Sequence, residues 1–390
     1  MDLSSPSYTD EEHYLGRVKR AVPQAGDIVI TREAPMGDVC QIPAGLKCCL
    51  GQRQVLLRPD PKRVDSRFLL YALQSPYIQH QIGWNEGTGS TVSNLRIPVL
   101  EALSVPTPEL AVQREVAETL GAIDDRITLL RETNTTLEAI AQALFKSWFV
   151  DFDPVHAKMQ GRAPEGMDQA TAVLFPDSFE ESELGPVPKG WRVGLLADLM
   201  RLHKGSVNPL IHPDVLFSHY SLPAFDEGQV PVVECGAEIK SNKTTVPPNA
   251  VLVSKLNPHI PRIWLPSAVD SNVVCSTEFL PFVPSSLTTT NFVYALLIEP
   301  SFMNAMTQLV TGTSNSHQRI KPDSVLSLKH VVPQEHIVKK FDEVVSALLE
   351  RMKATRQQIQ TLTALRDTLL PRLISGQLSL SEAQGIVEPA

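Results

Sequence analysis

Two loops rich in Thr, Ser, Gly and Asn carry side chains that could hold nucleic acid. The first loop, TGSTVSNLRI over 88–97, aligns with TGTSNSHQRI over 311–320, which lies 223 positions later. Backbone amides and hydroxyls can hold phosphates, and Arg, Asn or Gln can read base edges. A loop of this composition is, taken alone, more often only a turn. The candidate DNA contacts in the loops are Thr88, Ser90, Asn94, Arg96, Thr313, Asn315, His317 and Arg319.

Further basic residues flank the predicted strand ends and loops. Any one of them is more often a solvated surface charge than a DNA contact, but as a set they stand in matched places, as Arg32 and Lys255 do. The additional candidates for DNA binding are Arg32, Lys47, Arg53, Lys240, Lys243, Lys255 and Arg262.

The net charge of −8 over 390 residues does not decide the question. The excess acid lies in 109–150, with 7 acidic and 4 basic residues, and in 151–190, with 8 and 3. The rest of the chain is neutral overall, so its domains could still present basic faces. Charge therefore neither proves nor excludes DNA binding.

Composition narrows the class of protein. The 5 cysteines form no CxxC pair, which favours reduced thiols, a cytoplasmic protein and no metal. No apolar run approaches membrane-spanning length, and the first residues do not resemble a signal peptide. GxGxxG, GxxxxGK[ST], HExxH and GxSxG are all absent, so we predict no catalytic residue.

The elements that must position the loops occur twice. Tyr-Ala-Leu at 71–73 recurs at 294–296, and each copy runs on to a proline-marked boundary, VPTPE and then VVPQE. Each copy contains β-rich runs and one predicted amphipathic helix, over 65–82 and 289–309. The expected fold class is α+β, with two similar globular domains that are each followed by a long helix.

The two long helices show a 3.5-residue apolar repeat, 225 positions apart. This pattern predicts a coiled-coil seam, and the simplest pairing is an antiparallel coiled coil with a pseudo-twofold axis. The alternative is that each helix packs on its own globular domain. The first seam comprises Val116, Leu120, Ile123, Ile127, Leu130, Asn134, Leu137 and Leu144, and the second Phe341, Val345, Leu348, Met352, Ile359, Leu362 and Leu369.

These patterns divide the chain into six segments. They are a first globular domain over 1–108, a helix over 109–150, an acidic linker over 151–188, a second globular domain over 189–333, a helix over 334–376 and a tail over 377–390. Two similar domains on a stiff rod could measure a fixed length of duplex DNA.

Three segments resemble a known family. The segments ALFKSWFVDFDP at 143–154, LGPVPKGW at 184–191 and LLPRLISG at 369–376 resemble the conserved segments of specificity subunits of type I restriction-modification systems, which act in phage defence. With the repeat, the resemblance covers essentially the whole chain.

The resemblance implies a subunit without a catalytic site. Each target recognition domain would read one half of a bipartite DNA sequence, and the paired helices would set the gap. The implied partners are double-stranded DNA, modification (adenine methyltransferase) subunits that bind S-adenosylmethionine, and a restriction subunit that uses ATP and Mg. Those cofactors belong to the partners, and none is expected on this chain.

The first copy departs from the family pattern. It lacks a counterpart of GWRVGLLADLMRLHKG at 190–205, so we expect either a start site assigned too late or a shortened natural form. Loss of an opening strand would expose a sheet edge. Two other classes stay open: a coiled-coil scaffold that recognises no DNA sequence, and an enzyme in its own right. The target bases are not readable from one sequence.

Overall fold

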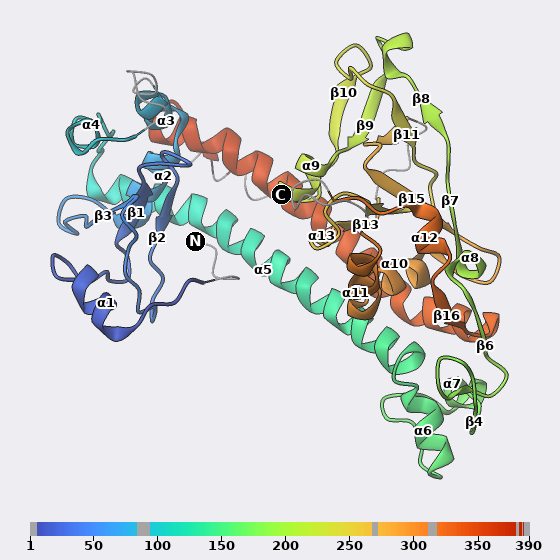
Figure 1. The fold of residues 1–390 in the computed structure, drawn as a ribbon. Coiled ribbons are helices and arrows are strands. Elements are labelled where there is room, and N and C mark those ends of the chain that lie inside the picture. The colour runs from blue at the N-terminus through green and yellow to red at the C-terminus, as the bar shows by residue number, and fades with distance from the viewer. Residues whose placement is uncertain are drawn as a thin grey trace. The chain divides into compact units, whose positions relative to one another are not determined.

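The computed structural model describes residues 6–83, 94–266, 272–310, 318–379, 382–383 and 385. The chain forms two compact units (Figure 1). The first unit combines Met1–Arg131 with Gln358–Ala390, and the second is Glu132–Gln357. Each unit therefore contains one globular domain and one half of each long helix.

The first globular domain is built on an antiparallel sheet of three strands. The strand order is β2-β1-β3, with the middle strand buried and the outer two only partly covered. Its elements are α1 (Glu11–Arg17), β1 (Ile28–Thr31), β2 (Val39–Gln41), β3 (Gln54–Leu57), α2 (Ser66–Gln74), α3 (Pro76–Gly83) and α4 (Ile97–Glu101).

The second globular domain repeats this sheet and adds to it. One sheet has the order β13-β12-β15-β7, and a second has the order β10-β9-β14-β11-β8. The elements are β6 (Arg192–Leu195), α8 (Leu196–Leu199), β7 (Met200–Leu202), β8 (Ser206–Val207), η1 (Pro209–Ile211), β9 (Leu216–Tyr220), α9 (Leu222–Asp226), β10 (Val232–Cys235), β11 (Lys243–Thr245), β12 (Val251–Ser254), β13 (Ile263–Trp264), β14 (Val273–Cys275), β15 (Phe279–Pro284), α10 (Thr290–Ile298), α11 (Pro300–Gln308), α12 (Pro322–Leu326) and β16 (Lys329–Val332).

The shared part of the two domains is the ladder β2-β1-β3, which matches β13-β12-β15. Val29 pairs with Leu56 in the first domain, and Leu252 pairs with Pro281 in the second. Both ladders are antiparallel, and β1 and β12 are the central strands. The sequence repeat therefore corresponds to a repeated α+β core.

The single helix predicted in each copy is two helices in the structure. Proline is the cause in both copies, because the residue before a proline is forced out of the helical region. Ser75 takes ψ 146° before Pro76, and Glu299 takes ψ 132° before Pro300. The 65–82 and 289–309 predictions were wrong in this respect.

The long helices are α5 (Leu110–Phe149) and α13 (Glu335–Ile374). In the first unit the N-terminal half of α5 packs against the C-terminal half of α13, and in the second unit the remaining halves pack together. This is the antiparallel pairing predicted from the seam. Both helices also pack on the globular domains. The apolar stripe therefore serves both interpretations: the helices pair with each other, and they also pack on the domains.

The seam positions differ in burial because of this double packing. Leu349 is buried in the same hydrophobic core as Phe292 of α10, whereas the predicted position Leu348 is only partly buried. The buried seam residues are Val116, Leu120, Ile123, Ile127, Leu130, Phe341, Val345, Met352, Leu362 and Leu369, and the partly buried ones are Asn134, Leu137, Leu144, Leu348 and Ile359.

The segment expected as a linker folds against the end of α5. It contains α6 (Asp153–Met159), α7 (Gln169–Leu174), β4 (Phe179–Glu180) and β5 (Val187–Pro188). Trp148 meets Phe175 edge to face at 5.1 Å between ring centroids, and Phe152 meets Trp191 at 5.7 Å. The acidic side chains of this segment therefore belong to a folded region that packs against the end of α5.

Candidate nucleic-acid interface

In the first domain, the chain returns from the loop region onto the end of β1. The Leu95 amide donates to the Arg32 carbonyl at 2.9 Å, and the Arg32 guanidinium donates to the Leu95 carbonyl at 2.8 Å and to Asn94 Oδ1 at 3.0 Å. Asn94 also donates to Glu33. Arg32 therefore braces this return point, and its guanidinium is already hydrogen-bonded within the domain.

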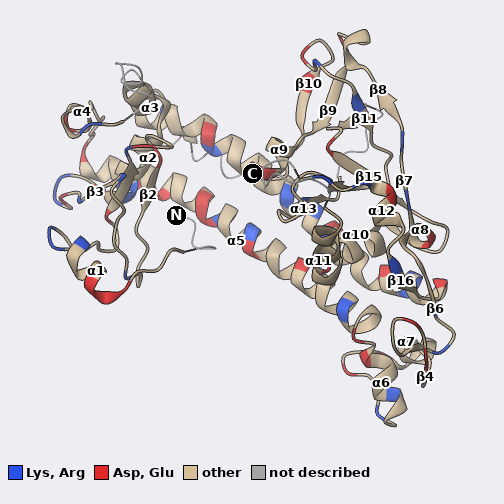
Figure 2. Cartoon of the chain, in the orientation of Figure 1, with Lys and Arg blue, Asp and Glu red and all other residues tan. Residues whose placement is uncertain are grey.

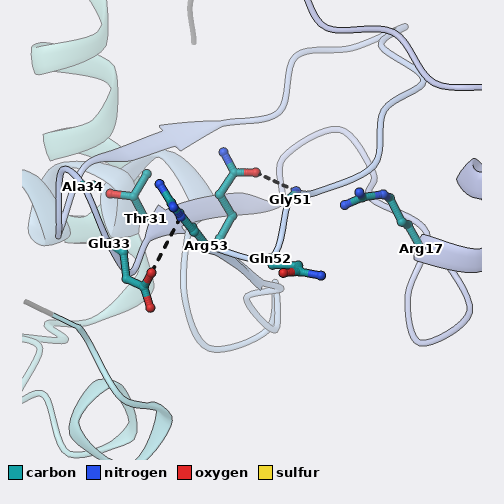
Figure 3. Close-up of a pocket in the computed structure, with 8 residues that line it drawn as sticks. Arg17, Thr31, Glu33, Ala34, Gly51, Gln52 and Arg53 are labelled. Carbon is teal, nitrogen blue, oxygen red and sulfur yellow. Dashed lines mark hydrogen bonds and ion pairs between the residues drawn. The ribbon is translucent and has the colours of Figure 1, made fainter. Parts of the chain in front are cut away.

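A hollow of about 580 Å³ lies beside this return point. Figure 3 shows Arg53 turned toward Glu33, with Arg17 on the other side of the hollow. The closest nitrogen–oxygen distance between Arg53 and Glu33 is 3.7 Å, and the Arg53 side chain is 69% exposed. Arg53 and Gln52 thus present donors that can serve phosphate or base contacts.

The second domain has the same return point at the end of β12. The Ile320 amide donates to the Lys255 carbonyl at 3.1 Å, as the Leu95 amide donates to Arg32. Arg319 donates two hydrogen bonds to Glu278, at 3.1 Å and 3.0 Å. This two-point contact raises the pKa of Arg319 and fixes the guanidinium beside β15.

The structure corrects the alignment of the two loops. Because Leu95 and Ile320 occupy the same place, the register there is 225 and not 223, so Arg319 corresponds to Asn94. Arg96 corresponds to Lys321, and these two residues precede α4 and α12 at the N-cap position. The predicted equivalence of Arg96 and Arg319 was therefore wrong, because the register changes before the return points.

Five candidate contacts fall outside the described residues. They are Thr88, Ser90, Thr313, Asn315 and His317.

The remaining candidates are spread over both domains. In the first domain, Lys47 is exposed and pairs with Glu11 of α1 at 3.1 Å. In the second, Arg262 makes two hydrogen bonds to Asp226, at 2.7 Å and 2.8 Å. Figure 2 shows acidic residues interspersed with the basic ones in both units. The described candidates therefore do not form one uniformly basic face.

Two further lysines lie near the five-stranded sheet. Lys240 is exposed and donates to the Ala237 carbonyl, and Lys243 on β11 donates to Ser241 at 3.2 Å. Partial burial lowers the pKa of Lys243, although Glu234 acts in the opposite direction. Neighbouring His219 bonds Glu234 at 2.6 Å, and burial lowers the pKa of its imidazole.

Sequence reasoning missed a pair of tyrosines that join the domains to the long helices. Tyr71 donates to Asp124 of α5 at 2.7 Å, and Arg366 of α13 donates to the same carboxylate at 2.8 Å. In the second unit, Tyr294 donates to Glu138 of α5. The repeated Tyr-Ala-Leu triplets were the available signal, but they served only as markers of the repeat.

No group of three or more His, Cys, Asp or Glu residues that could hold a metal ion occurs in the described ranges. Among the helices that the structure describes, none is long and apolar enough to cross a membrane.

Residues 3–139 match a family model described as the type I restriction modification DNA specificity domain. The chain is 26% identical to the type I restriction enzyme HindI specificity subunit of Haemophilus influenzae, over 75% of this chain and 73% of the relative. It is 24% identical to the MjaIX specificity subunit of Methanocaldococcus jannaschii, over 92% and 78%. Over most of its length the chain is therefore similar to specificity subunits of type I restriction enzymes.

A solved structure with the same fold is the S subunit of the type I restriction-modification system from M. genitalium. Its TM-score is 0.52 at 18% identity, covering 90% of this chain and 83% of that one. Members of this family are named for DNA specificity, so the family match contradicts the scaffold alternative that recognises no DNA sequence. The chain thus contains two related α+β domains and two paired long helices.

Proposed function

We propose that this chain is the DNA-recognition subunit of a type I restriction-modification complex. Each globular domain reads one half of a two-part target, and α5 and α13 hold the two readers and set the gap between half-sites. The observation that carries this proposal is the repeated return point, where a Gly/Ser/Thr/Asn-rich loop ends beside a cationic residue, Arg32 or Lys255, at the end of a central strand. The family match supports it.

The partners follow from the same proposal. Modification subunits that bind S-adenosylmethionine and methylate adenine dock on the long helices, and a restriction subunit supplies the ATP- and Mg-dependent steps. This chain itself supplies recognition and no catalytic residue, and it acts in the cytoplasm. Arg side chains held by carboxylates, as Arg319 is by Glu278, are positioned donors and so suit base or phosphate contacts.

The first experiment is genome-wide mapping of adenine methylation in the host, with and without this gene. Loss of a single bipartite methylated motif is the expected result, and it also supplies the target sequence. An unchanged methylation pattern in a host whose modification subunits are expressed would contradict the proposal.

A variant separates the two readers. Arg319→Ala should weaken discrimination at one half-site by about 1–3 kcal/mol and leave the other half-site unaffected. Arg192→Ala is the matched control, because Arg192 is also an exposed arginine of the second domain paired with a carboxylate, Asp198 at 3.0 Å. Equal weakening at both half-sites would contradict a two-reader model.

A further inference from the structure

The hairpin between β12 and β13 in the second domain is anchored on both sides. At its base, the Ser254 amide donates to the Arg262 carbonyl at 2.9 Å. On its first arm, the Asn257 amide donates to the Gln318 carbonyl at 2.8 Å, beside the return point of this domain. Past these contacts the chain is exposed over 259–261. The hairpin therefore presents a short tip next to the proposed site of DNA contact.

The turn that leads into the tip has an uncommon backbone conformation. Asn257 takes φ 51°, in the left-handed region, which few residues other than glycine adopt. The Ile260 amide closes the turn by donating to the Asn257 carbonyl at 2.9 Å, and Pro258 between them is buried. Pro258 and Pro261 fix φ on either side of His259 and Ile260. The backbone that carries His259 is thus ordered before any ligand binds, which lowers the entropy cost of binding.

The first domain makes the same turn in its hairpin between β1 and β2. At the base of that hairpin, the Thr31 amide donates to the Asp38 carbonyl at 2.8 Å. Ala34 holds the place of Asn257, takes φ 44° and is also followed by a proline. A non-glycine residue in this region costs about 1–3 kcal/mol, and such strain is concentrated at functional sites. Its recurrence at the same place in both domains indicates a shared role for the two hairpin tips.

Arg262, one of the predicted DNA contacts, has the geometry of a brace for this hairpin. Its Nε and Nη2 atoms donate to the two carboxylate oxygens of Asp226 on α9, at 2.7 Å and 2.8 Å. The Arg262 side chain is only 12% exposed, whereas that of Asp226 is 48% exposed. This two-point contact raises the pKa of Arg262 and ties the end of the hairpin to α9. The exposed polar side chain of the tip is therefore that of His259.

We propose that His259 reads a base edge of the second half-site, and that Arg262 and Asp226 fix the direction of the hairpin that presents it. This inference rests on the proposed function of the chain. A neutral imidazole offers one donor and one acceptor, and both kinds of group can pair with base edges in the grooves of DNA. Arg262 is accordingly a positioning residue, which acts through the hairpin and does not touch DNA.

The first test uses the chain in complex with its modification subunits. Binding is measured to a duplex that carries the methylated target, and to duplexes that each differ from it at one base pair. His259→Ala should reduce discrimination at one base pair of the second half-site by about tenfold, and leave the first half-site unchanged. The matched control is His212→Ala, at an exposed histidine of the same domain outside the hairpin. The control should discriminate as the unmodified chain does.

A second test separates a brace from a phosphate contact. Asp226→Asn and Arg262→Gln should both reduce discrimination at the base pair that His259→Ala affects, and neither should add to the effect of His259→Ala in a double variant. The salt dependence of binding should stay unchanged, whereas loss of one phosphate contact would lower its slope by about one. If Arg262 bound a phosphate, Asp226→Asn would strengthen binding to every sequence and leave discrimination intact. Thermal unfolding of each variant checks that the domain is still folded.

Three results would overturn the proposal. The first is an unchanged second half-site in His259→Ala when Arg319→Ala relaxes it, which would leave the proposed function standing. The second is uniform weakening by His259→Ala at every sequence, which would assign His259 to a phosphate. The third is a lower salt slope in Arg262→Gln with discrimination intact, which would make Arg262 a DNA contact. Absence of any bipartite methylated motif that depends on this gene would instead overturn the proposed function together with this inference.

Discussion

The two globular domains share one ladder and differ in what covers it. In the second domain, β15 is closed by β7, and Phe282 is fully buried. In the first, no strand among the described residues pairs with the outer edge of the equivalent strand β3, and its apolar side chains are only partly buried. The comparison separates two parts of such a domain. The first is a three-stranded ladder with two helices, which forms in both copies. The second is a strand–helix–strand cover (β6, α8 and β7), which the structure describes in only one copy.

The return points, where the chain after each loop meets the end of β1 or β12, share their backbone and differ in one side chain. Both place a backbone amide on the end of the central strand, at Arg32 or Lys255. The side chain that follows the loop is Asn94 in one copy and Arg319 in the other, and each contacts a glutamate, Glu33 or Glu278. The backbone arrangement is thus the same in both domains, while the side chain at this position is a neutral amide in one and a cation in the other.

The largest expected effect comes from removing the main anchor of the cover. Trp191→Ala should destabilise the second domain by about 3–5 kcal/mol, because the buried ring packs 5.9 Å from Phe149 between centroids. Urea unfolding with hydrogen exchange measures this, and exchange should accelerate in β6 and β16 but not in β1 or β3. Tyr77→Ala, at a residue 56% exposed, is the control. A loss below about 1 kcal/mol would mean that the cover contributes little.

The next effect depends on pH. His330 on β16 lines a small cavity of about 130 Å³ together with Leu196 and Phe302, and burial lowers its pKa to about 4. The imidazole takes up a proton near pH 6.5 in the unfolded chain but only near pH 4 in the folded chain. The contribution of His330 to stability is therefore fully present above pH 6.5 and is lost as the pH falls toward 4. The loss should reach about 3 kcal/mol.

A variant isolates this contribution. Val105 holds the equivalent position in the first domain, so His330→Val makes the two copies alike. Unfolding curves from pH 7 to pH 4 should lose the part of the slope that His330 contributes. His336→Val, at an exposed residue of α13, should keep the full slope. An unaltered slope in His330→Val would show that its imidazole is accessible to protons in the folded state.

The tyrosines test whether the two copies are attached to the helices equally. Tyr71→Phe and Tyr294→Phe each remove a hydroxyl that donates to a carboxylate of α5, and each should cost about 1–2 kcal/mol. Thermal unfolding of the two single variants and of the double variant measures the effect, and the costs should add. A cost in only one variant would show that the attachments differ in energy although they look alike.

Much of this organisation was predictable from the sequence. The repeat follows from recurring residues such as the Tyr-Ala-Leu triplet, the shared strands from β-rich runs, and the helix pairing from apolar periodicity. All three are local properties of the sequence. The double packing of Leu349 and the Tyr71–Asp124–Arg366 contact were not predictable, because they depend on which elements meet. Local chemistry was also overlooked: Pro76 and Pro300 break helices that periodicity alone joins.

The smallest expected effect concerns α1, whose Arg17 lines the hollow beside the return point of the first domain. Lys47 joins α1 to the domain through Glu11 at 3.1 Å and lies 4.5 Å from the centroid of the Tyr14 ring. Both charged side chains are more than 60% exposed, so Lys47→Ala should change global stability by less than about 1 kcal/mol. Exchange of the α1 amides should nevertheless become faster, because this contact holds the helix locally. Lys19→Ala, at an exposed residue just after α1, is the control. A global loss above about 1 kcal/mol would show that α1 belongs to the folded core, and the hollow would then have a rigid wall.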